Sequence, residues 1–333
     1  MSRKLHRRAF LMSAAATGLA TAWPISGHAG IADIPRSDYG FDTTADDVVA
    51  GLDLTGKTAL MTGCNSGLGF ESMRAMAAKG AHVIGAARNL EKAEEACASV
   101  EGRTTPVVCE LTDFDTVVAC SQTVAALDEP LDILICNAGI MALPERELVY
   151  GLEKQFVVNH LGHFLLTRRV MPQLEASPEA RVVVLSSIGY KQAPPEGIQF
   201  DNLDWAENYS PFTAYGQSKL ANALFSRELA RRMAGTTVYS NSVHPGFVAT
   251  NLGRYIMGRP ADPDEPLRPG FKTPVQGAAT QVYVATDPRL DGVSGYYFED
   301  CNPVEPEGPH MQDDALAQKL WEVSDDLVAD YLG

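Results

Sequence analysis

Short apolar runs alternate with longer segments of helical periodicity along most of the chain. Uninterrupted apolar runs of this length are typical of strands buried on both faces, and the intervening segments repeat at the spacing of helices. The predicted strands are Lys57–Gly63, Ala81–Ala86, Thr105–Leu111, Leu131–Asn137, Arg181–Ser187, Thr237–His244 and Gly295–Phe298. The predicted helices are Phe70–Lys79, Leu90–Val100, Thr116–Ala126, Leu152–Glu175, Ala214–Ala234 and Val275–Thr286. The alternation predicts an α/β fold, a doubly wound parallel sheet in a single domain with helices on both faces.

The first 29 residues have the composition of a targeting segment. They contain no acidic residue, and Arg3, Lys4, Arg7 and Arg8 precede a mildly apolar run that ends near Trp23. The paired arginines resemble a bacterial twin-arginine export signal, and small residues precede a cleavage point after position 29. We therefore expect an exported, periplasmic protein with no stable membrane span after processing. An uncleaved anchor, a disordered basic tail and a cytoplasmic location are the alternatives.

The remaining chain divides into a leader, residues 30–52, and one large domain, residues 53–333. Within the leader, Ile31–Asp42 is predicted to be irregular, and Thr44 can cap a short helix, Ala45–Ala50.

The overall charge argues against nucleic acid as a partner. The chain carries a net charge of −15, and residues 1–29 contribute four basic and no acidic side chains, so the remainder carries −19. Such a field repels phosphate backbones. No pair of the six cysteines has C-x-x-C spacing, and His160 and His163 stand without a cluster of further ligands. The cysteines are predicted to be buried apolar residues, and no metal site is predicted.

A glycine-rich turn connects the first predicted strand to the first long helix. It carries Gly63, Asn65, Ser66, Gly67, Leu68 and Gly69. Glycine allows the backbone to turn tightly and approach a pyrophosphate, whose charge is met by the amides of the new helix. The turn lacks the Lys-Ser/Thr of a nucleotide-hydrolysing P-loop. Its context therefore favours dinucleotide binding.

Further residues with polar or conformational roles stand at the ends of the predicted strands. They are Gly63, Arg88, Glu110, Asn137 and Ser187. Ligands of parallel sheets bind beyond the carboxyl ends of the strands, so these residues are expected at one site.

Tyr215 and Lys219 stand four residues apart at the start of a predicted helix and can therefore share one face. A fixed cation stabilises a phenolate, so Lys219 is expected to lower the pKa of Tyr215 toward neutral pH, where general acid/base catalysis is efficient.

Taken together, these motifs resemble the short-chain dehydrogenase/reductase family of the classical type, and more narrowly its retinol-dehydrogenase-like and protochlorophyllide-reductase-like branch. The matching pieces follow the family's order: Thr62–Gly69, Asn137–Gly139, Gly151–Phe164, Ser186–Ser187, Tyr215–Lys219 and His244–Gly246. The resemblance implies a Rossmann-type fold and oxidoreductase activity on carbonyl or alcohol groups.

The same resemblance implies a role for each catalytic candidate. Tyr215 would exchange a proton with the substrate oxygen, and Ser187 would hydrogen-bond that oxygen. Lys219 would bind the nicotinamide ribose, and Asn159 would hold a water that links Lys219 to solvent. Ser186, adjacent to Ser187, is a second candidate for the oxygen's partner, although the family pattern places the catalytic serine second.

Cofactor choice depends on the end of the second predicted strand, where Arg88 stands and no acidic residue does. Arg88 can pair with a 2′-phosphate and Asn65 can donate to it, so NADP is expected over NAD. By resemblance, Glu110 and Leu111 flank the adenine, although the family usually has Asp at the first of these positions. The other implied cofactor residues are Asn137, Ala138, Gly139, Tyr215, Lys219, Pro245, Gly246, Val248 and Thr250.

Two segments are expected to shape the substrate site. The insert between Ser187 and Tyr215 is long and contains Phe200, Trp205 and Tyr209, and the stretch Leu252–Phe271 is also rich in large apolar side chains. Both favour a bulky, lipophilic small molecule. A dinucleotide-binding regulator without turnover and a scaffold are the rival functions. The resemblance also suggests a homodimer or homotetramer.

Overall fold

One eight-stranded sheet organises the protein. The computed structural model describes residues 30–262 and 264–333, so the signal predicted within Met1–Ala29 lies outside the described residues. The sheet consists of β1 (Thr58–Thr62), β2 (His82–Ala87), β3 (Thr104–Val108), β4 (Ile133–Cys136), β7 (Ala180–Leu185), β8 (Val238–His244), β11 (Tyr297–Glu299) and β12 (Asn302–Pro303). Two short pairs lie outside it: β5 (Leu148–Val149) with β6 (Leu152–Glu153), and β9 (Phe247–Val248) with β10 (Phe271–Lys272).

The strand order is β12-β11-β8-β7-β4-β1-β2-β3. All neighbours are parallel except the antiparallel pair β11 and β12. The chain starts in the middle, moves outward through β2 and β3, and then returns to β4 on the other side of β1. Ligands of such sheets bind where the order reverses, at the carboxyl ends of β1 and β4.

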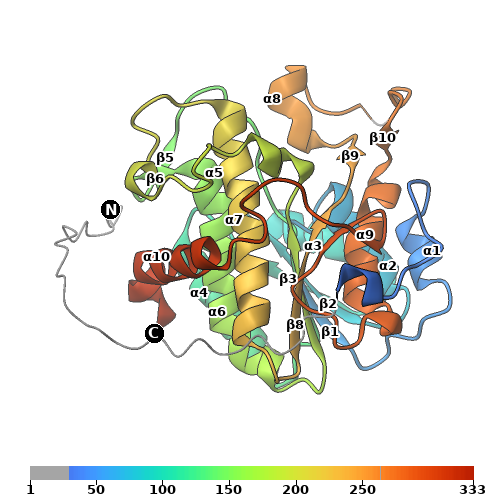
Figure 1. The fold of residues 1–333 in the computed structure, drawn as a ribbon. Coiled ribbons are helices and arrows are strands. Elements are labelled where there is room, and N and C mark those ends of the chain that lie inside the picture. Colours follow the sequence, from blue (N-terminus) through green and yellow to red (C-terminus); the bar gives the residue numbers. More distant parts are fainter. Residues whose placement is uncertain (1–29, 263) are drawn as a thin grey trace.

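Helices cover both faces of the sheet (Figure 1). One face carries α1 (Ala45–Val49), α2 (Gly67–Ala77), α3 (Leu90–Ala98) and α9 (Pro274–Thr286). The other carries α4 (Phe114–Ala126), α6 (Gly162–Glu175), α7 (Pro211–Arg232) and α10 (Asp314–Leu332). The predicted doubly wound α/β fold is therefore confirmed.

Three helix predictions need correction. The helix α2 begins at Gly67, three residues earlier than predicted, so the last glycines of the turn form its first turn. The predicted helix Leu152–Glu175 is divided: after β6 come α5 (Lys154–Phe156), a π-helical turn η2 (Val157–Leu161) and α6. Finally, α10 was not predicted at all, although its buried residues Ala317, Leu320, Trp321, Ser324 and Val328 follow helical spacing.

The leader is attached to the domain by specific hydrogen bonds. The Ser37 backbone N–H donates to Asn302 Oδ1 (3.0 Å), and the Ser37 hydroxyl donates to the Cys301 carbonyl (2.8 Å). The Asn302 amide also donates to the Tyr39 carbonyl (3.0 Å). As predicted, Thr44 caps α1 by accepting from the Asp47 N–H (3.2 Å). The leader thus packs beside the β11–β12 turn.

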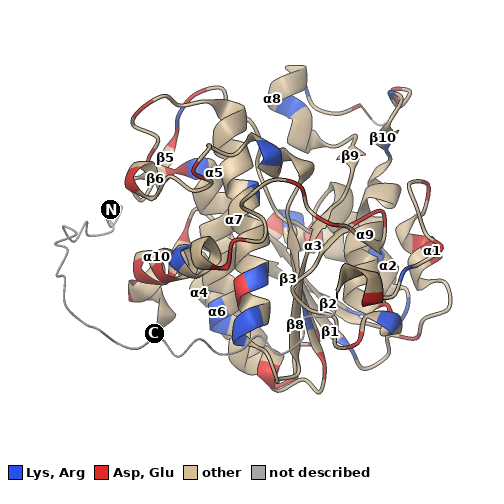
Figure 2. Cartoon of the chain, in the orientation of Figure 1, with Lys and Arg blue, Asp and Glu red and all other residues tan. Residues whose placement is uncertain are grey.

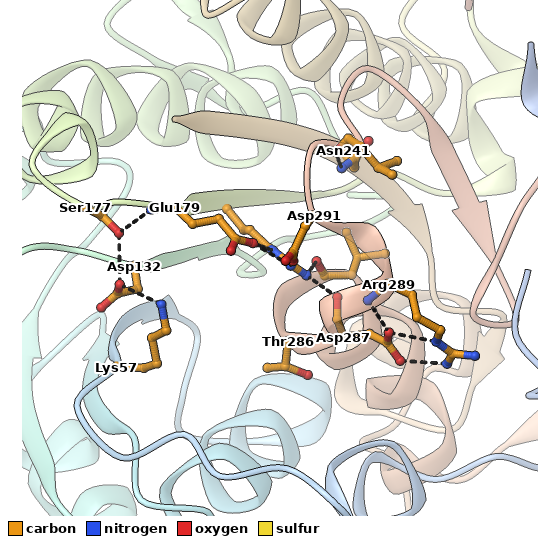
Figure 3. A network of polar contacts seen from close by, with 12 residues as sticks. Lys57, Asp132, Ser177, Glu179, Asn241, Thr286, Asp287, Arg289 and Asp291 are labelled. Carbon is orange, nitrogen blue, oxygen red and sulfur yellow. Dashed lines mark hydrogen bonds and ion pairs between the residues drawn. The ribbon is translucent and has the colours of Figure 1, made fainter. Parts of the chain in front are cut away.

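A polar network joins elements at the amino ends of the central strands, opposite the predicted site (Figure 3). Asp132 accepts from Lys57 (3.1 Å), Ser177 (2.9 Å) and the Thr58 N–H (2.9 Å). Arg181, which is 7% exposed, pairs with Glu179 (2.6 Å) and Asp291 and donates to the Asp287 carbonyl (2.6 Å) at the end of α9. These bonds fasten α9 to β7.

Figure 2 shows acidic residues along α10 and in several loops. Within the described ranges, no helix is long and apolar enough to span a bilayer. All six cysteines are buried, as predicted.

Candidate active site

The glycine turn follows β1 and has the conformation that its sequence predicts. Gly63 and Gly67 have φ values of 71° and 55°, which favour glycine. A Cβ on Gly69 would lie 2.2 Å from the Gly63 carbonyl oxygen, so only glycine lets α2 approach β1 this closely. No side chain caps the first turn of α2 at Ser66. The first amides of α2 are thus arranged as in an anion-binding helix start.

Backbone hydrogen bonds hold this turn against the end of β2. The N–H groups of Gly63 and Cys64 both donate to the Ala86 carbonyl, at 2.8 and 3.2 Å. Asn65 directly follows Cys64 in the turn, and Arg88 directly follows the last residue of β2. Both residues are exposed. The two predicted 2′-phosphate ligands therefore belong to adjoining segments of one edge.

Asn137 fastens the end of β4 to the end of β1. Its side-chain amide donates to the Thr62 carbonyl (2.8 Å), and the N–H groups of Asn137 and Ala138 donate to the Thr62 hydroxyl (2.9 and 3.0 Å). Gly139 follows, and a Cβ there would lie 3.1 Å from Asn159 Oδ1 and 3.7 Å from Lys219 Nζ. This segment leads from the glycine turn to the catalytic candidates.

The two neighbouring serines after β7 point in different directions. Ser186 is 2% exposed and donates to the Lys219 carbonyl (2.7 Å), which anchors α7. Ser187 caps the 3-10 helix η3 (Ile188–Gln192) by accepting from the Gly189 N–H (3.0 Å). It also lies beside Tyr215, where it acts to lower the pKa of the phenol. The geometry therefore assigns the position beside the phenol to Ser187.

Tyr215 is held in a tight, buried setting. Its exposure is 5%, and a Cβ on Gly189 would lie 2.8 Å from its Cε1. Burial raises the pKa of Tyr215 to about 12, and Ser187 acts in the opposite direction. The expected lowering of this pKa by Lys219 is thus not found in the protein alone.

The environment of Lys219 explains that correction. Its ammonium donates to the Leu185 carbonyl (2.9 Å) and lies 5.7 Å from the centre of the Tyr215 ring. Burial lowers the pKa of Lys219 to about 8. The desolvation of both side chains therefore outweighs their mutual attraction.

Asn159 lies inside the π-helical turn and connects three segments. Its Oδ1 accepts from the Ile140 N–H (2.8 Å), and its amide donates to the Ile140 carbonyl (2.9 Å) and the Ser218 hydroxyl (2.9 Å). Ser218 in turn donates to the Tyr215 carbonyl (2.7 Å). Through Ser218, Asn159 is therefore hydrogen-bonded to α7, the helix that carries Tyr215 and Lys219.

The predicted nicotinamide segment follows β8. A Cβ on Gly67 would lie 3.2 Å from Thr250 Cγ2, so this segment folds back onto the glycine turn. Gly246 has a φ of 89° and packs against the stem of Lys272, which is 1% exposed and ion-paired with Asp300. Pro245 and Val248 are half-buried at the same edge.

The Glu110 carboxylate is directed back toward its own loop. It accepts from the Thr112 N–H (3.0 Å) and the Thr112 hydroxyl (2.8 Å). Leu111 is 3% exposed and packs against Gly162. Both residues lie at the β3 edge as predicted, but in this conformation Glu110 is engaged by Thr112.

Sequence reasoning missed several residues of this edge: Thr62, His163, Ser218 and Lys272. The sequence shows that His163 shares a helical face with His160. It does not show the polar partner of His163, because that partner is distant in sequence. In the described part of the chain, no group of three or more His, Cys, Asp or Glu side chains could hold a metal ion.

A glycine turn at the switch point of a parallel sheet, with a half-buried serine and a buried Tyr-Lys pair beyond it, defines a dinucleotide-dependent oxidoreductase of the short-chain type. The chain belongs to the short-chain dehydrogenase/reductase family, whose members use NAD(P). The family model described as short chain dehydrogenase matches residues 57–200.

Similar proteins of known name support the same assignment. The chain is 40% identical over 316 residues to short-chain dehydrogenase TIC 32 B, chloroplastic, from Brassica napus, covering 91% of this chain and 97% of that protein. It is 42% identical over 295 residues to retinol dehydrogenase 14 from Homo sapiens, covering 82% and 86%. A crystal structure of an uncharacterized protein from Mycobacterium Paratuberculosis matches with a TM-score of 0.69 at 32% identity, covering 86% and 98%.

Proposed function

We propose that this protein is an NADP-preferring oxidoreductase that transfers a hydride between nicotinamide and a lipophilic carbonyl or alcohol substrate. The proposal is carried by one observation: the buried residues Tyr215, Lys219 and Asn159 form a connected set with the half-buried Ser187, beside the half-buried backbone of Gly139. A regulator or scaffold without turnover would not need this set.

In this proposal, Tyr215 is the general acid/base and Ser187 orients the substrate oxygen. The cofactor, when bound, supplies or accepts the hydride. A phenol with a pKa of about 12 is protonated at neutral pH and is therefore ready to donate to the oxygen of a carbonyl. Lys219 stands within reach to bind the ribose and to stabilise the phenolate that donation leaves behind. Asn159 connects this helix to the Ile140 backbone.

The NADP preference rests on charge. Arg88 is exposed at the end of β2, and no hydrogen bond or ion pair engages its side chain in the described structure. Asn65 is exposed on the adjoining turn. A guanidinium in this position suits a 2′-phosphate, and a nearby carboxylate that would bind a ribose 2′-hydroxyl is missing from the segment Ala86–Asn89.

The lipophilic substrate class is supported by exposed apolar side chains next to the nicotinamide segment. Phe247 is 59% exposed on β9, and Tyr255, Ile256 and Met257 on α8 (Arg254–Met257) are 43%, 51% and 40% exposed. Such a patch is typical of surfaces that meet apolar ligands. The later part of the long insert packs elsewhere: Phe200 and Trp205 line an open hollow of about 830 Å³ together with residues of α10.

The direct test is turnover. Purified protein is mixed with NADPH or NADH and a panel of aldehydes, ketones and quinones of increasing apolar size, and the loss of nicotinamide absorbance is followed. We expect faster oxidation of NADPH than of NADH and better turnover of the larger apolar substrates. Cofactor binding without turnover of any panel member, or of the matching alcohols with NADP, would instead favour the regulator.

The twin-arginine pattern motivates a proposal about location. Such a route carries folded proteins, so we propose that NADP binds before export and travels inside the folded domain. The exported enzyme would then recycle its cofactor by oxidising one substrate and reducing another, with ping-pong kinetics. Cell fractionation with measurement of bound nucleotide tests this: full-length protein confined to the cytosol contradicts export, and folded exported protein without nucleotide contradicts a captive cofactor.

A further inference from the structure

A buried imidazole lies between the cofactor turn and the catalytic helices. His163 is 1% exposed and belongs to α6, two residues after the π-helical turn. Its Nε2 lies 2.8 Å from the Thr62 hydroxyl oxygen, and its Nδ1 lies 3.0 Å from the Asn159 carbonyl oxygen. Both ring nitrogens are therefore hydrogen-bonded, Nε2 to the strand that leads into the glycine turn and Nδ1 to the turn that carries Asn159.

The hydrogen bonds determine which nitrogen carries the proton. A hydroxyl offers two acceptor positions and one donor. The N–H groups of Asn137 and Ala138 occupy both acceptor positions of Thr62, so its hydroxyl must donate. Its alternative acceptor, the Ile135 carbonyl, is 3.4 Å away, and Nε2 of His163 is closer. Nε2 is therefore the acceptor, and Nδ1 carries the hydrogen that binds the Asn159 carbonyl.

The ring stays neutral at neutral pH. Burial lowers the pKa of His163 to about 4, and the nearby Lys219 acts in the same direction. His160, the other titratable group on this turn, bonds to Ser324 (2.8 Å) and is also neutral because burial lowers its pKa to about 3. Only the neutral ring can accept from Thr62.

The two hydrogen bonds of His163 hold different parts of the site. Thr62 ends β1, and its hydroxyl holds the Asn137–Ala138 backbone that leads to the cofactor edge. The Asn159 carbonyl belongs to the turn in which the Gly162 N–H bonds to the Val157 carbonyl, five residues back. A ring bond from His163 helps satisfy this irregular turn and so fixes the direction of the Asn159 side chain.

We propose that His163 is a positioning residue that couples the cofactor turn to Asn159: its Nε2 orients the Thr62 hydroxyl, and its Nδ1–H fixes the π-helical turn. The proposal rests on the proposed function for its catalytic consequence. The tautomer and the cofactor affinity are consequences that do not depend on turnover.

The first test is spectroscopic. Nitrogen-15 spectra of the side chain report whether Nδ1 or Nε2 carries the proton, with His163→Gln used to assign the signal. We expect the Nδ1–H form throughout pH 6 to 8 in the wild type. Thr62→Val removes the donor to Nε2, whereas Thr62→Ser retains it, so only the valine variant should alter the Nε2 signal. An Nε2–H tautomer in the wild type would overturn the proposal.

The second test separates the two bonds with matched variants. The amide of His163→Asn can still donate to the Asn159 carbonyl but does not reach Thr62. The longer amide of His163→Gln reaches Thr62 but is displaced from the Asn159 carbonyl. Because a buried group is left without a partner in each case, we expect about a fivefold or larger effect. His163→Asn should mainly weaken NADPH binding, and His163→Gln should mainly lower kcat.

The outcomes separate positioning from general support. Opposite patterns of NADPH affinity and kcat in the two variants support the proposal, with Thr62→Ser restoring the affinity that Thr62→Val loses. The proposal would be overturned if both variants lost NADPH affinity and kcat to the same extent and in proportion to their loss of melting temperature. If the wild type bound NADPH but did not turn over, the proposed function would fail, and the tautomer and affinity would still decide the coupling.

Discussion

Ser187 differs from its neighbour Ser186 mainly in the direction of its hydroxyl. Ser186 and Ser187 are adjacent, yet one hydroxyl anchors α7 through the Lys219 carbonyl and the other meets the phenol. The sequence alone could not show which hydroxyl faces the phenol. Successive side chains of a strand point to opposite sides, but this rule stops holding where the strand ends, and both serines follow β7.

This difference gives a prediction with a built-in control. Ser187→Ala should lower kcat by about 10²-fold, within the range for a lost group that stabilises the reacting oxygen, with little change in melting temperature. Ser186→Ala should lower stability by about 1 kcal/mol because a buried bond is lost, with a smaller effect on kcat. Steady-state kinetics and thermal melts of both variants check this; a larger kcat loss in the Ser186 variant would contradict the assignment.

Arg88 determines the cofactor preference in this account. Arg88→Asp should invert the preference from NADPH to NADH, because repulsion replaces attraction at the 2′-phosphate and the carboxylate can accept from a 2′-hydroxyl. Near a protein surface such a pair interacts by a few kcal/mol, so the ratio of kcat/KM values should change by at least about tenfold. Lys92→Asp, at a half-buried position of α3, is the charge-matched control. An unchanged ratio in the Arg88 variant would show that its guanidinium is only solvated.

At the scale of elements, the glycine turn depends on close packing between α2 and β1. A Cβ on Gly69 would lie 2.2 Å from the Gly63 carbonyl and 2.5 Å from the Asn137 amide. Gly69→Ala should therefore displace the turn, abolish measurable NADPH binding and lower the melting temperature. Gly51→Ala, where a Cβ meets nothing within 4 Å, should change neither. Fluorescence titration with NADPH and thermal melts measure both effects, and normal affinity in Gly69→Ala would contradict this packing.

Most regular elements could be predicted from the sequence because buried parallel strands read as apolar runs. The π-helical turn at Val157–Leu161 could not, since it depends on the tertiary bonds between the Asn159 side chain and the Ile140 backbone. The helix α10 could also have been predicted, because its buried face follows helical spacing and acidic residues stand on its exposed side. The catalytic candidates within the family motifs were predictable. Thr62 and His163 also lie within such motifs, but their contact was not predictable because 101 positions separate them.

For the molecule as a whole, buried neutral groups make stability depend on pH. Burial lowers the pKa of His160, His163 and His244 to about 3, 4 and 4, whereas an unfolded histidine titrates near about 6.5. Between these values the unfolded chain binds more protons than the folded one. The stability contribution is therefore complete above about pH 6.5 and is lost as the pH falls toward 4.

Urea unfolding at several pH values between 7.5 and 4.5 measures this effect. His160→Phe should reduce the pH slope, because the variant removes one group whose protonation favours the unfolded state. The aromatic surroundings of His160, formed by Phe156, Phe164 and Phe225, favour such a replacement. A slope identical to that of the wild type would show that His160 does not contribute to acid sensitivity.

The polar network at the amino ends of the strands should carry stability and not activity. Arg181→Ala removes the buried guanidinium that joins Glu179, Asp291 and the end of α9. The two carboxylates left behind remain solvated, with side chains 30% and 57% exposed, so the main cost is the Asp287 carbonyl left without its donor, about 1–3 kcal/mol. We expect a loss of this size in the free energy of unfolding and a near-normal NADPH affinity in the remaining folded protein. Lys57→Ala, whose side chain is 39% exposed, should cost much less.

The central claim, hydride transfer assisted by Tyr215, is tested most directly by following an isotope. NADPH deuterated at nicotinamide C4, in each of the two stereoisomers, is incubated with the best carbonyl substrate and either wild-type protein or Tyr215→Phe. Hydride transfer predicts deuterium on the alcohol carbon from one stereoisomer with the wild type. It also predicts a loss of about 10²- to 10⁴-fold in the rate with Tyr215→Phe, which keeps its NADPH affinity. Equal rates in the two proteins, or product without deuterium from either stereoisomer, would contradict it.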